Sequence, residues 1–337
     1  MSAALALLFA AAVHAQPSHE ALYVYSGADR GVRLAQQARR EGAVVLYTSL
    51  APSESGPLLQ AFEKKYGIKV DLWRSNSEKV SQRTITEARG GRFQLDAVET
   101  IGTDLEKMTR EGIFAEFYSP HLADLIPEAI PAHRRWMPDR LSYLGVAYNT
   151  RLVRRDELPR AYEGFLDARW QGRLGVEASD VVWLTGIVKL WGEERAMRFF
   201  NRLARMKPDV RSGHTLLTQL VISGEVPVGL TVYSSSVESA KRSGAPIDWI
   251  PVEPVVAQPL GIGLAKRAPH PHAALLFADF VLSPEGQALF ASLGRPPASR
   301  KVKTTLGQFE SVMMDPAVEL DASTKWEKVW KAFFLNR

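Results

Sequence analysis

The chain has 337 residues, of which 46% are hydrophobic and 23% charged, and its formal net charge is +5. This composition is typical of a folded protein with room for two domains. It contains no cysteine, which excludes disulfides, thiolate metal sites and a cysteine nucleophile. The excess of Lys and Arg is spread along the chain without a long basic run, so we expect no nucleic acid as a partner.

The first 15 residues, MSAALALLFAAAVHA, are almost wholly apolar. The run is too short to span a bilayer, which takes roughly 20 residues. Val13 and Ala15 fit the small-residue positions before a cleavage site, so residues 1–15 are predicted to be a signal peptide, although no Lys or Arg precedes the apolar stretch. The alternative is a buried N-terminal helix. We expect a mature protein that starts at Gln16 and is soluble and periplasmic.

Strands and helices alternate in the first third of the chain. Apolar runs at 43–50, 68–77 and 93–100 predict strands, and amphipathic stretches at 29–42, 53–67, 78–91 and 103–112 predict helices. This alternation is typical of a parallel sheet that is covered by helices on both faces.

The alternation loosens over residues 119–139, a proline-rich stretch, and then begins again. Strands are predicted at 140–151, 170–180 and 226–236, and an extended segment at 245–269. Helices are predicted at 181–192, 193–206, 212–225 and 323–337, and two helices within 270–294. We therefore expect an α/β protein of two lobes. The N-terminal lobe would comprise residues 16–140 and 255–300, and the C-terminal lobe 141–254 and 301–337 with the closing helices. Two crossing strands would form a hinge near Tyr148 and Pro251.

Catalytic and cofactor signatures are missing from the sequence. The phosphate-loop pattern G-x-x-x-x-G-K-[ST], G-x-G-x-x-G, H-E-x-x-H and G-x-S-x-G do not occur. His270 and His272 flank a proline and have no third ligand nearby in sequence, so we interpret them as surface residues. We expect no enzyme, no catalytic residue, no cofactor and no bound metal. An exported enzyme on the same scaffold is the alternative, although no nucleophile–base pair is visible.

Short polar clusters follow several predicted strands. In open α/β sheets, ligands bind outside the carboxyl ends of the strands, where helix N-termini offer N–H groups to anions. Arg74 adds a forked donor suited to carboxylate or phosphate. Each cluster could instead be an ordinary helix N-cap. The candidate ligand-binding residues are Tyr47, Thr48, Ser49, Arg74, Ser75, Asn76, Glu99, Thr100, Tyr143, Ser179, Asp180, Gly213, His214, Thr215, Tyr233, Ser234 and Ser235.

Several segments together resemble a known family. EGAVVLYTSL, YLGVAYNTR, RWQGRLGVEASD, SGEVPVGLTV and GIGLAKRAPHPHAALLFADFVLSPEGQALF are similar to type II solute-binding proteins of ABC importers, in the group that contains the ferric-ion-binding proteins. The resemblance implies the two-lobed periplasmic-binding-protein-like II fold, each lobe a mostly parallel sheet with flanking helices, joined by a two-strand hinge. It also implies a monomer that docks on an inner-membrane permease and has no catalytic activity.

The sequence departs from the ferric-binding pattern at one strand end. There the family has two adjacent tyrosines, whereas this chain has Ser234 and Ser235, with Tyr233 one position earlier. Serine hydroxyls suit hydrogen bonding to an oxyanion better than they suit Fe(III). We therefore expect a small anionic solute, an organic acid, a phosphonate or another oxyanion. A ferric-ion-binding protein and an exported sensor-type binding protein are the alternatives.

Overall fold

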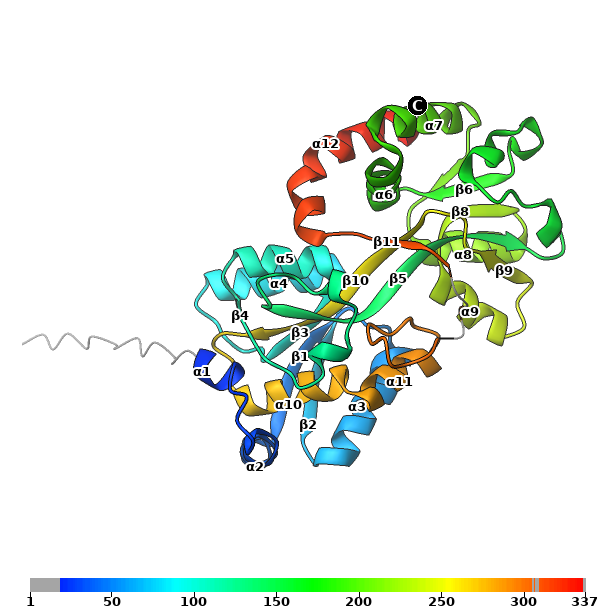
Figure 1. Cartoon of the computed structure of the whole chain (residues 1–337). Helices are drawn as coiled ribbons and strands as arrows, with labels where there is room; N and C mark the ends of the chain where they lie inside the picture. Colours follow the sequence, from blue (N-terminus) through cyan, green and yellow to red (C-terminus); the bar gives the residue numbers. More distant parts are fainter. Residues whose placement is uncertain (1–18, 305, 307–308, 336–337) are drawn as a thin grey trace, which may run out of the picture.

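The computed structural model describes residues 19–304, 306 and 309–335. The predicted signal peptide, residues 1–15, and the predicted mature start at Gln16 lie outside the described residues. Figure 1 shows two lobes, each built of strands and helices, with two long strands running between them: β5 (Trp136–Asn149) and β10 (Val255–Ala265). The predicted two-lobed α/β fold is confirmed.

The N-terminal lobe contains the strands and helices of the first third of the chain and two later helices. Its elements are α1 (Glu20–Tyr23), α2 (Arg30–Glu41), β1 (Ala43–Thr48), α3 (Pro52–Tyr66), β2 (Lys69–Arg74), α4 (Ser77–Arg89), β3 (Ala97–Ile101), α5 (Gly102–Arg110), β4 (Phe114–Ala115), the 3₁₀ helices η1 (Leu122–Asp124) and η2 (Pro127–Ala129), α10 (Pro271–Leu282) and α11 (Pro284–Ser292). Helices α2 and α3 end at Gly42 and Gly67, whose φ angles of 76° and 69° lie in the left-handed region that favours glycine.

The C-terminal lobe contains most of the remaining elements. They are η3 (Arg155–Glu157), η4 (Tyr162–Leu166), η5 (Ala168–Trp170), β6 (Leu174–Glu177), α6 (Val181–Trp191), α7 (Glu193–Arg205), β7 (Asp209–Arg211), α8 (His214–Ser223), β8 (Val228–Tyr233), α9 (Ser234–Arg242), β9 (Ile247–Ile250) and α12 (Pro316–Phe334). The short strands β4, β7 and β11 (Ser311–Met313) were not predicted, because three or fewer residues give no readable hydrophobic period.

One sheet runs through both lobes in the order β2-β1-β3-β10-β5-β8-β6-β7. Strand β1 is parallel to β2 and β3, and β6 is parallel to β7 and β8, whereas β10 and β5 are antiparallel to their neighbours along this path. Thr48 pairs with both Arg74 and Glu99, so the carboxyl ends of the three N-terminal strands share one edge. That edge faces the C-terminal lobe.

The crossing point of the two lobes lies in the middle of β5 and β10. Met137 and Ile262 belong to the N-terminal core, whereas Leu144 and Val256 belong to the C-terminal core. Tyr148, near which the hinge was predicted, is buried in the C-terminal core at the far end of β5. Strand β11 adds a third, parallel strand to β10 at this crossing.

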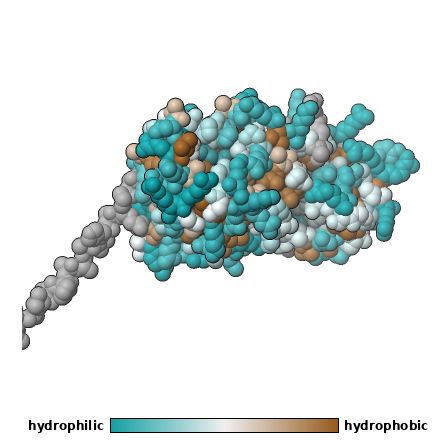
Figure 2. Space-filling model, turned by 90° about the horizontal axis from the view of Figure 1, so that it is seen from below, coloured by the Kyte–Doolittle hydropathy of each residue, from teal (hydrophilic) through white to brown (hydrophobic). Residues whose placement is uncertain are grey.

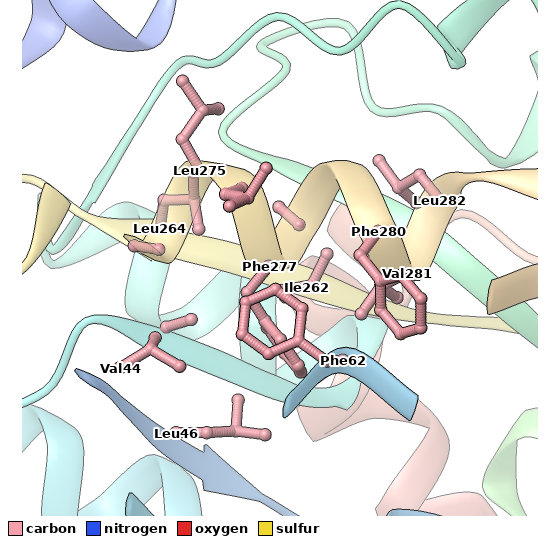
Figure 3. Packing of buried hydrophobic residues seen from close by; sticks show 14 of the residues in the cluster. Val44, Leu46, Phe62, Ile262, Leu264, Leu275, Phe277, Phe280, Val281 and Leu282 are labelled. Atoms are coloured by element: carbon pink, nitrogen blue, oxygen red, sulfur yellow. The ribbon is translucent and has the colours of Figure 1, made fainter. Parts of the chain in front are cut away.

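Helix α10 forms the centre of the N-terminal core, and all its residues except His272 are buried. Figure 3 shows Phe277 and Phe280 of α10 packed beside Phe62 of α3, with Val44 and Leu46 of β1 below them. The rings of Phe62 and Phe277 meet edge to face with centroids 5.0 Å apart. This close packing holds the carboxyl ends of the strands rigidly at the cleft.

Helix α12 connects the two lobes at the end of the chain. Trp330 lies in the C-terminal core, where its indole donates to the carbonyl of Ala178 at 2.7 Å. At its first turns, Asp321 pairs with Arg110 of α5 in the N-terminal lobe. The helix therefore closes one side of the cleft.

In the part of the chain that the structure describes, no single helix is long and apolar enough to cross a membrane. The bent pair of helices α10 and α11 is long and apolar enough only when the two are taken together, by length and composition alone. Figure 2 shows one face of the molecule, on which hydrophilic side chains predominate and apolar ones are scattered.

Candidate functional site

The cleft between the lobes holds two adjoining cavities. The first, of about 390 Å³, is here named the basic chamber and is lined by Ser49, Ala51, Glu54, Arg74, Asn76, Ser77, Ile101, Arg140, Ser142, His214, Thr215, Tyr233, Ser236, Gln258, Leu260 and Arg295. The second, of about 310 Å³, is named the acidic chamber and is lined by Ile101, Thr103, Lys107, Ser179, Asp180, Val181, Val182, Thr185, His214, Tyr233, Gln258, Glu319, Leu320, Ser323, Trp326 and Glu327. Four residues, from both lobes, line both cavities.

Arg140 forms the floor of the basic chamber from the middle of β5. Its Nη1 donates to Glu99 and, at 2.9 Å, to Asp139, and the hydroxyl of Thr48 donates to the second oxygen of Glu99. Burial raises the pKa of Asp139; Arg140 opposes this rise and Glu99 adds to it. A buried charge is stable only with such partners, so this network fixes a permanent cation in the wall.

Arg295 brings a second cation to the basic chamber, from the loop after α11. It forms an ion pair with Glu54 of α3, and its Nη1 donates to the hydroxyl of Ser235 in α9. This last contact joins the two lobes across the cleft. Burial lowers the pKa of Arg295; Glu54 opposes the effect and the like charge of Arg140 adds to it. An anion placed between the two guanidinium groups would relieve that repulsion.

Arg74 supplies the third cation, at the end of β2. Its Nε donates to the carbonyl of Leu50 at 3.0 Å, and among the described residues it has no carboxylate partner. The pairing with Glu78 that the sequence allowed is not formed. The guanidinium group therefore keeps donors for a ligand.

The first turns of four helices also line the basic chamber. They contribute Ala51 before α3, Asn76 before α4, His214 of α8 and Ser236 of α9. Asn76 caps α4 by accepting from the backbone N–H of Lys79 at 2.9 Å. The unpaired N–H groups and the positive ends of the helix dipoles favour negative charge at this point.

Tyr233 separates the two chambers. Strand β8 ends at this residue and α9 begins at Ser234, so the alternation of side chains does not continue past Tyr233. The Tyr233 ring packs on the imidazole of His214 with centroids 3.8 Å apart. Burial raises the pKa of Tyr233, and Asp180 and Glu177 add to the rise, so the neutral phenol is strongly favoured over the phenolate.

The acidic chamber is closed by α12. Glu319 of this helix lines it opposite Asp180, whose Oδ1 lies 3.1 Å from Nε2 of His214. Burial raises the pKa of Glu319 to about 8; Asp315 adds to this and Lys189 opposes it. Lys107 also lines this chamber but pairs with Asp104 at 2.9 Å.

One side-chain group has a spacing that could hold a metal ion. Glu177, Asp180 and His214 each place a ligand atom within 4.8 Å of the others. The two oxygens of Glu177 already accept from the N–H groups of Gly213 and Ser179, at 2.8 and 2.6 Å, and from the Ser179 hydroxyl at 2.6 Å. These bonds tie the start of α8 to the loop after β6.

A third cavity, of about 450 Å³, lies in the N-terminal lobe between α4 and the loop that follows β10. Its cations are largely engaged, since Arg89 pairs with Glu111 and Arg267 stacks over Phe93 at 4.6 Å. The interlobe cleft, which combines unpaired donors with residues from both lobes, is therefore the better candidate site.

The family model that matches the sequence is that of bacterial extracellular solute-binding proteins, and it covers residues 58–319. This is more than half of the chain. The chain belongs to this family. Family members are binding components of ABC importers, which act outside the cytoplasm and are not enzymes.

Relatives of this solute-binding protein share its size and fold. The iron uptake protein A1 of Synechocystis is 24% identical over 304 residues, which cover 79% of this chain and 80% of that protein. Iron-bound HitA from Pseudomonas aeruginosa superposes with a TM-score of 0.74 at 21% identity, covering 86% of this chain and 99% of HitA. AfuA from Actinobacillus pleuropneumoniae, with fructose-6-phosphate bound, superposes with a TM-score of 0.71 at 20% identity, and the match covers 88% of this chain and 99% of AfuA. The two structural matches are evidence for the fold alone.

The structure brings about half of the predicted ligand-binding residues together at the cleft. Those that line a chamber are Ser49, Arg74, Asn76, Ser179, Asp180, His214, Thr215 and Tyr233. Thr48, Glu99, Gly213 and Ser235 lie behind them and hold lining residues in place. Thr100 and Ser234 are fully buried, and the hydroxyl of neither has a partner among the described residues.

Three predicted residues need correction, because the structure places them outside both chambers. Tyr47 lies on the other face of β1, beneath α4, where its hydroxyl donates to Glu87 at 3.0 Å. Tyr143 packs edge to face on Phe309 at the lobe crossing, with ring centroids 5.0 Å apart. The backbone N–H of Ser75 donates to Thr48 at 3.1 Å, extending the pairing of β1 and β2. Successive side chains along a strand point to opposite faces of the sheet. The prediction grouped neighbouring polar residues together and did not distinguish the two faces.

The prediction missed residues that reach the cleft from distant parts of the chain. They are Glu54, Arg140, Ser142, Gln258, Arg295 and Glu319. A usable signal existed for Arg140, because an Asp-Arg pair inside an otherwise apolar strand has to be buried and paired. Arg295 follows α11 in a loop and Glu319 lies in the terminal helix α12, and no comparable sequence signal marks either residue.

Proposed function

We propose that this solute-binding protein captures a small anion in the basic chamber and delivers it to the inner-membrane permease of an ABC importer. The observation that carries the proposal is the lining of the basic chamber, where Arg74, Arg140 and Arg295 outnumber the single lining carboxylate, that of Glu54. Arg140 and Arg295 are already paired with carboxylates, so Arg74, which has no such partner among the described residues, supplies the uncompensated charge. Four helix N-termini add to the positive potential. Charge-assisted hydrogen bonds from such donors are the strong ones in recognition of carboxylate and phosphate.

A ferric ion is the second candidate solute. Relatives named for iron, and the spacing of Glu177, Asp180 and His214, favour it. Tyr233 argues against iron, because the raised pKa of this phenol opposes formation of a phenolate ligand. Among the described residues, no second tyrosine lines either chamber. The anion is therefore the better supported solute.

A ligand screen on purified protein separates the two candidates. The protein is unfolded, freed of carried-over ligand and refolded, and its melting temperature is followed with citrate, phosphate, methylphosphonate, fructose 6-phosphate and ferric citrate. We expect one or more iron-free anions to raise the melting temperature, and the sample with ferric citrate to stay colourless after desalting. A visible band that persists and is lost in Tyr233→Phe would overturn the anion proposal in favour of iron.

We further propose that the mature protein starts at Gln16, is periplasmic and acts as a monomer without enzymatic activity. N-terminal sequencing of exported material and light scattering test the first and third points. Recovery of intact Met1 on cytoplasmic protein, or a stable dimer, would contradict them.

A further inference from the structure

The two chambers of the cleft have opposite chemical character. Three arginines line the basic chamber, whereas Asp180, Glu319 and Glu327 line the acidic one. The two cations at the acidic chamber are already engaged, His214 by Asp180 and Lys107 by Asp104. Tyr233 and Ile101 line both cavities, so a ligand that spanned the two would pass these side chains.

Two carboxylate oxygens in the acidic chamber lack a donor. Oδ2 of Asp180 and Oε1 of Glu319 are buried and have no hydrogen-bond partner among the described residues, and Asp180 is 2% exposed. A buried acceptor without a donor is costly, and carboxylate oxygens accept best from cations. The two orphan oxygens come from different segments, the loop before α6 and the first turn of α12, yet line the same cavity.

The donors that fit these oxygens are those of an ammonium group. A metal ion would need lone pairs on His214, but both ring nitrogens face acceptors: Nδ1 lies 3.2 Å from the carbonyl of Thr231 and Nε2 lies 3.1 Å from Asp180. In this arrangement both nitrogens are placed to donate hydrogen bonds, so neither directs a lone pair toward a metal. An alkylammonium offers three N–H donors and a positive charge and needs acceptors alone.

We propose that the solute is a zwitterion, in which an oxyanion is held by the arginines of the basic chamber and a primary ammonium group by Asp180 and Glu319. A short apolar spacer between the two charges would pass Ile101 and Tyr233. This inference rests on the proposed capture of an anion and narrows it to anions that carry an amine.

Matched pairs of probes, identical except for the amine, test the proposal by calorimetry. 3-Aminopropylphosphonate is compared with butylphosphonate, and 4-aminobutyrate with pentanoate; in each pair a methyl group replaces the ammonium. We expect the amine of at least one pair to bind about tenfold tighter or more than its methyl analogue, as one charge-assisted hydrogen bond provides. Glu319→Gln should reduce this preference and leave the affinity for the methyl analogue unchanged.

A control and a second variant make the test specific. Glu194→Gln changes an exposed carboxylate of α7 that lines neither chamber and should keep the preference. Asp180→Asn should also reduce the preference, but it removes the partner of His214, so the decision rests on Glu319→Gln.

The outcomes distinguish this inference from the proposed function. Equal affinity for the two members of each pair would contradict the proposal of a zwitterion and leave the proposal of an anion unaffected. No binding of any of the four probes overturns the zwitterion, and binding of ferric ion in their place would overturn both proposals. Tight binding of Zn²⁺ or Mn²⁺ that is lost in Asp180→Asn would show a metal site where we place the ammonium.

Discussion

The two walls of the cleft are built differently. On the N-terminal side, Arg140 and Arg295 are bound to carboxylates of their own lobe, so the cations are fixed before any ligand arrives. On the C-terminal side and on α12, Asp180 and Glu319 each keep a buried oxygen that has no donor among the described residues. A preformed wall of this kind lowers the cost of ordering on binding, whereas an unsatisfied one gains most when a ligand fills it.

Substitution of Arg140, the buried cation of the N-terminal wall, should give the largest change in the free energy of unfolding. Arg140→Met would leave Glu99 and Asp139 buried without their partner, which costs on the order of 3–5 kcal/mol. We expect the free energy of unfolding at neutral pH to fall by that amount in urea titrations followed by circular dichroism.

The matched control for this substitution removes the orphaned charge as well. Arg140→Met combined with Glu99→Gln should be less destabilised than Arg140→Met alone, because fewer uncompensated charges remain buried. If the double variant is the less stable of the two, the arginine stabilises the wall by packing and not through its charge.

The exposed cation at the cleft edge should affect binding and leave folding nearly unchanged. Arg74→Ala removes charge-assisted donors worth on the order of 1.5–3 kcal/mol, a loss of roughly tenfold or more in affinity. Calorimetry with whichever anion raises the melting temperature most measures it. Arg198→Ala on α7, an exposed arginine that lines neither chamber, is the control and should bind like the parent protein.

An affinity for Arg74→Ala equal to that of the control would show that Arg74 is a surface residue. In that case the basic chamber would rest on Arg140 and Arg295 alone, and the contrast between the two walls would be sharper.

The unsatisfied carboxyl group of Glu319 should make the stability of the folded protein depend on pH. Burial raises the pKa of Glu319 from its ordinary value of 4.5 to about 8. Between these two pH values the folded protein keeps this proton while the unfolded chain has lost it, so stability falls as pH rises. The free energy of unfolding of the ligand-free protein should therefore drop relative to that of Glu319→Gln between pH 4.5 and pH 8.

Denaturant titrations of both proteins across this range give the difference directly. A constant difference would mean that Glu319 ionises normally in the folded protein, and Asp180 would then be the one unsatisfied carboxylate in the comparison of the walls.

The smallest expected effect is a decrease in the radius of gyration when the two lobes close on the ligand. The lobes should rotate about the crossing of β5 and β10, between Met137 and Leu144 on one strand and Val256 and Ile262 on the other. Small-angle scattering should show a smaller radius of gyration with the anion that raises the melting temperature most. Arg74→Ala at the same ligand concentration should close less, and an unchanged radius in the parent protein would indicate a rigid cleft.

Much of the fold could be predicted from hydrophobic periodicity. The segments that became α2, α7 and β8 are long or regular enough for a local pattern to identify them, and the glycines after α2 and α3 end those helices as expected. Among the polar residues singled out at the carboxyl ends of strands, Arg74, Asp180 and His214 line the cleft. These features depend on residues that are neighbours in the chain.

The tertiary structure alone decided which side chains face the ligand. Tyr47 and Thr48 are adjacent letters, yet strand alternation sends the first beneath α4 and the second toward Glu99. Arg295 and Glu319 reach the chambers from a loop and from the terminal helix, because two lobes built from interrupted segments meet there. The sequence by itself thus determined the elements and the family, since local periodicity and turn chemistry act within a few residues. The opposed charges of the two chambers arise from contacts between distant segments, which only the packing of the lobes creates.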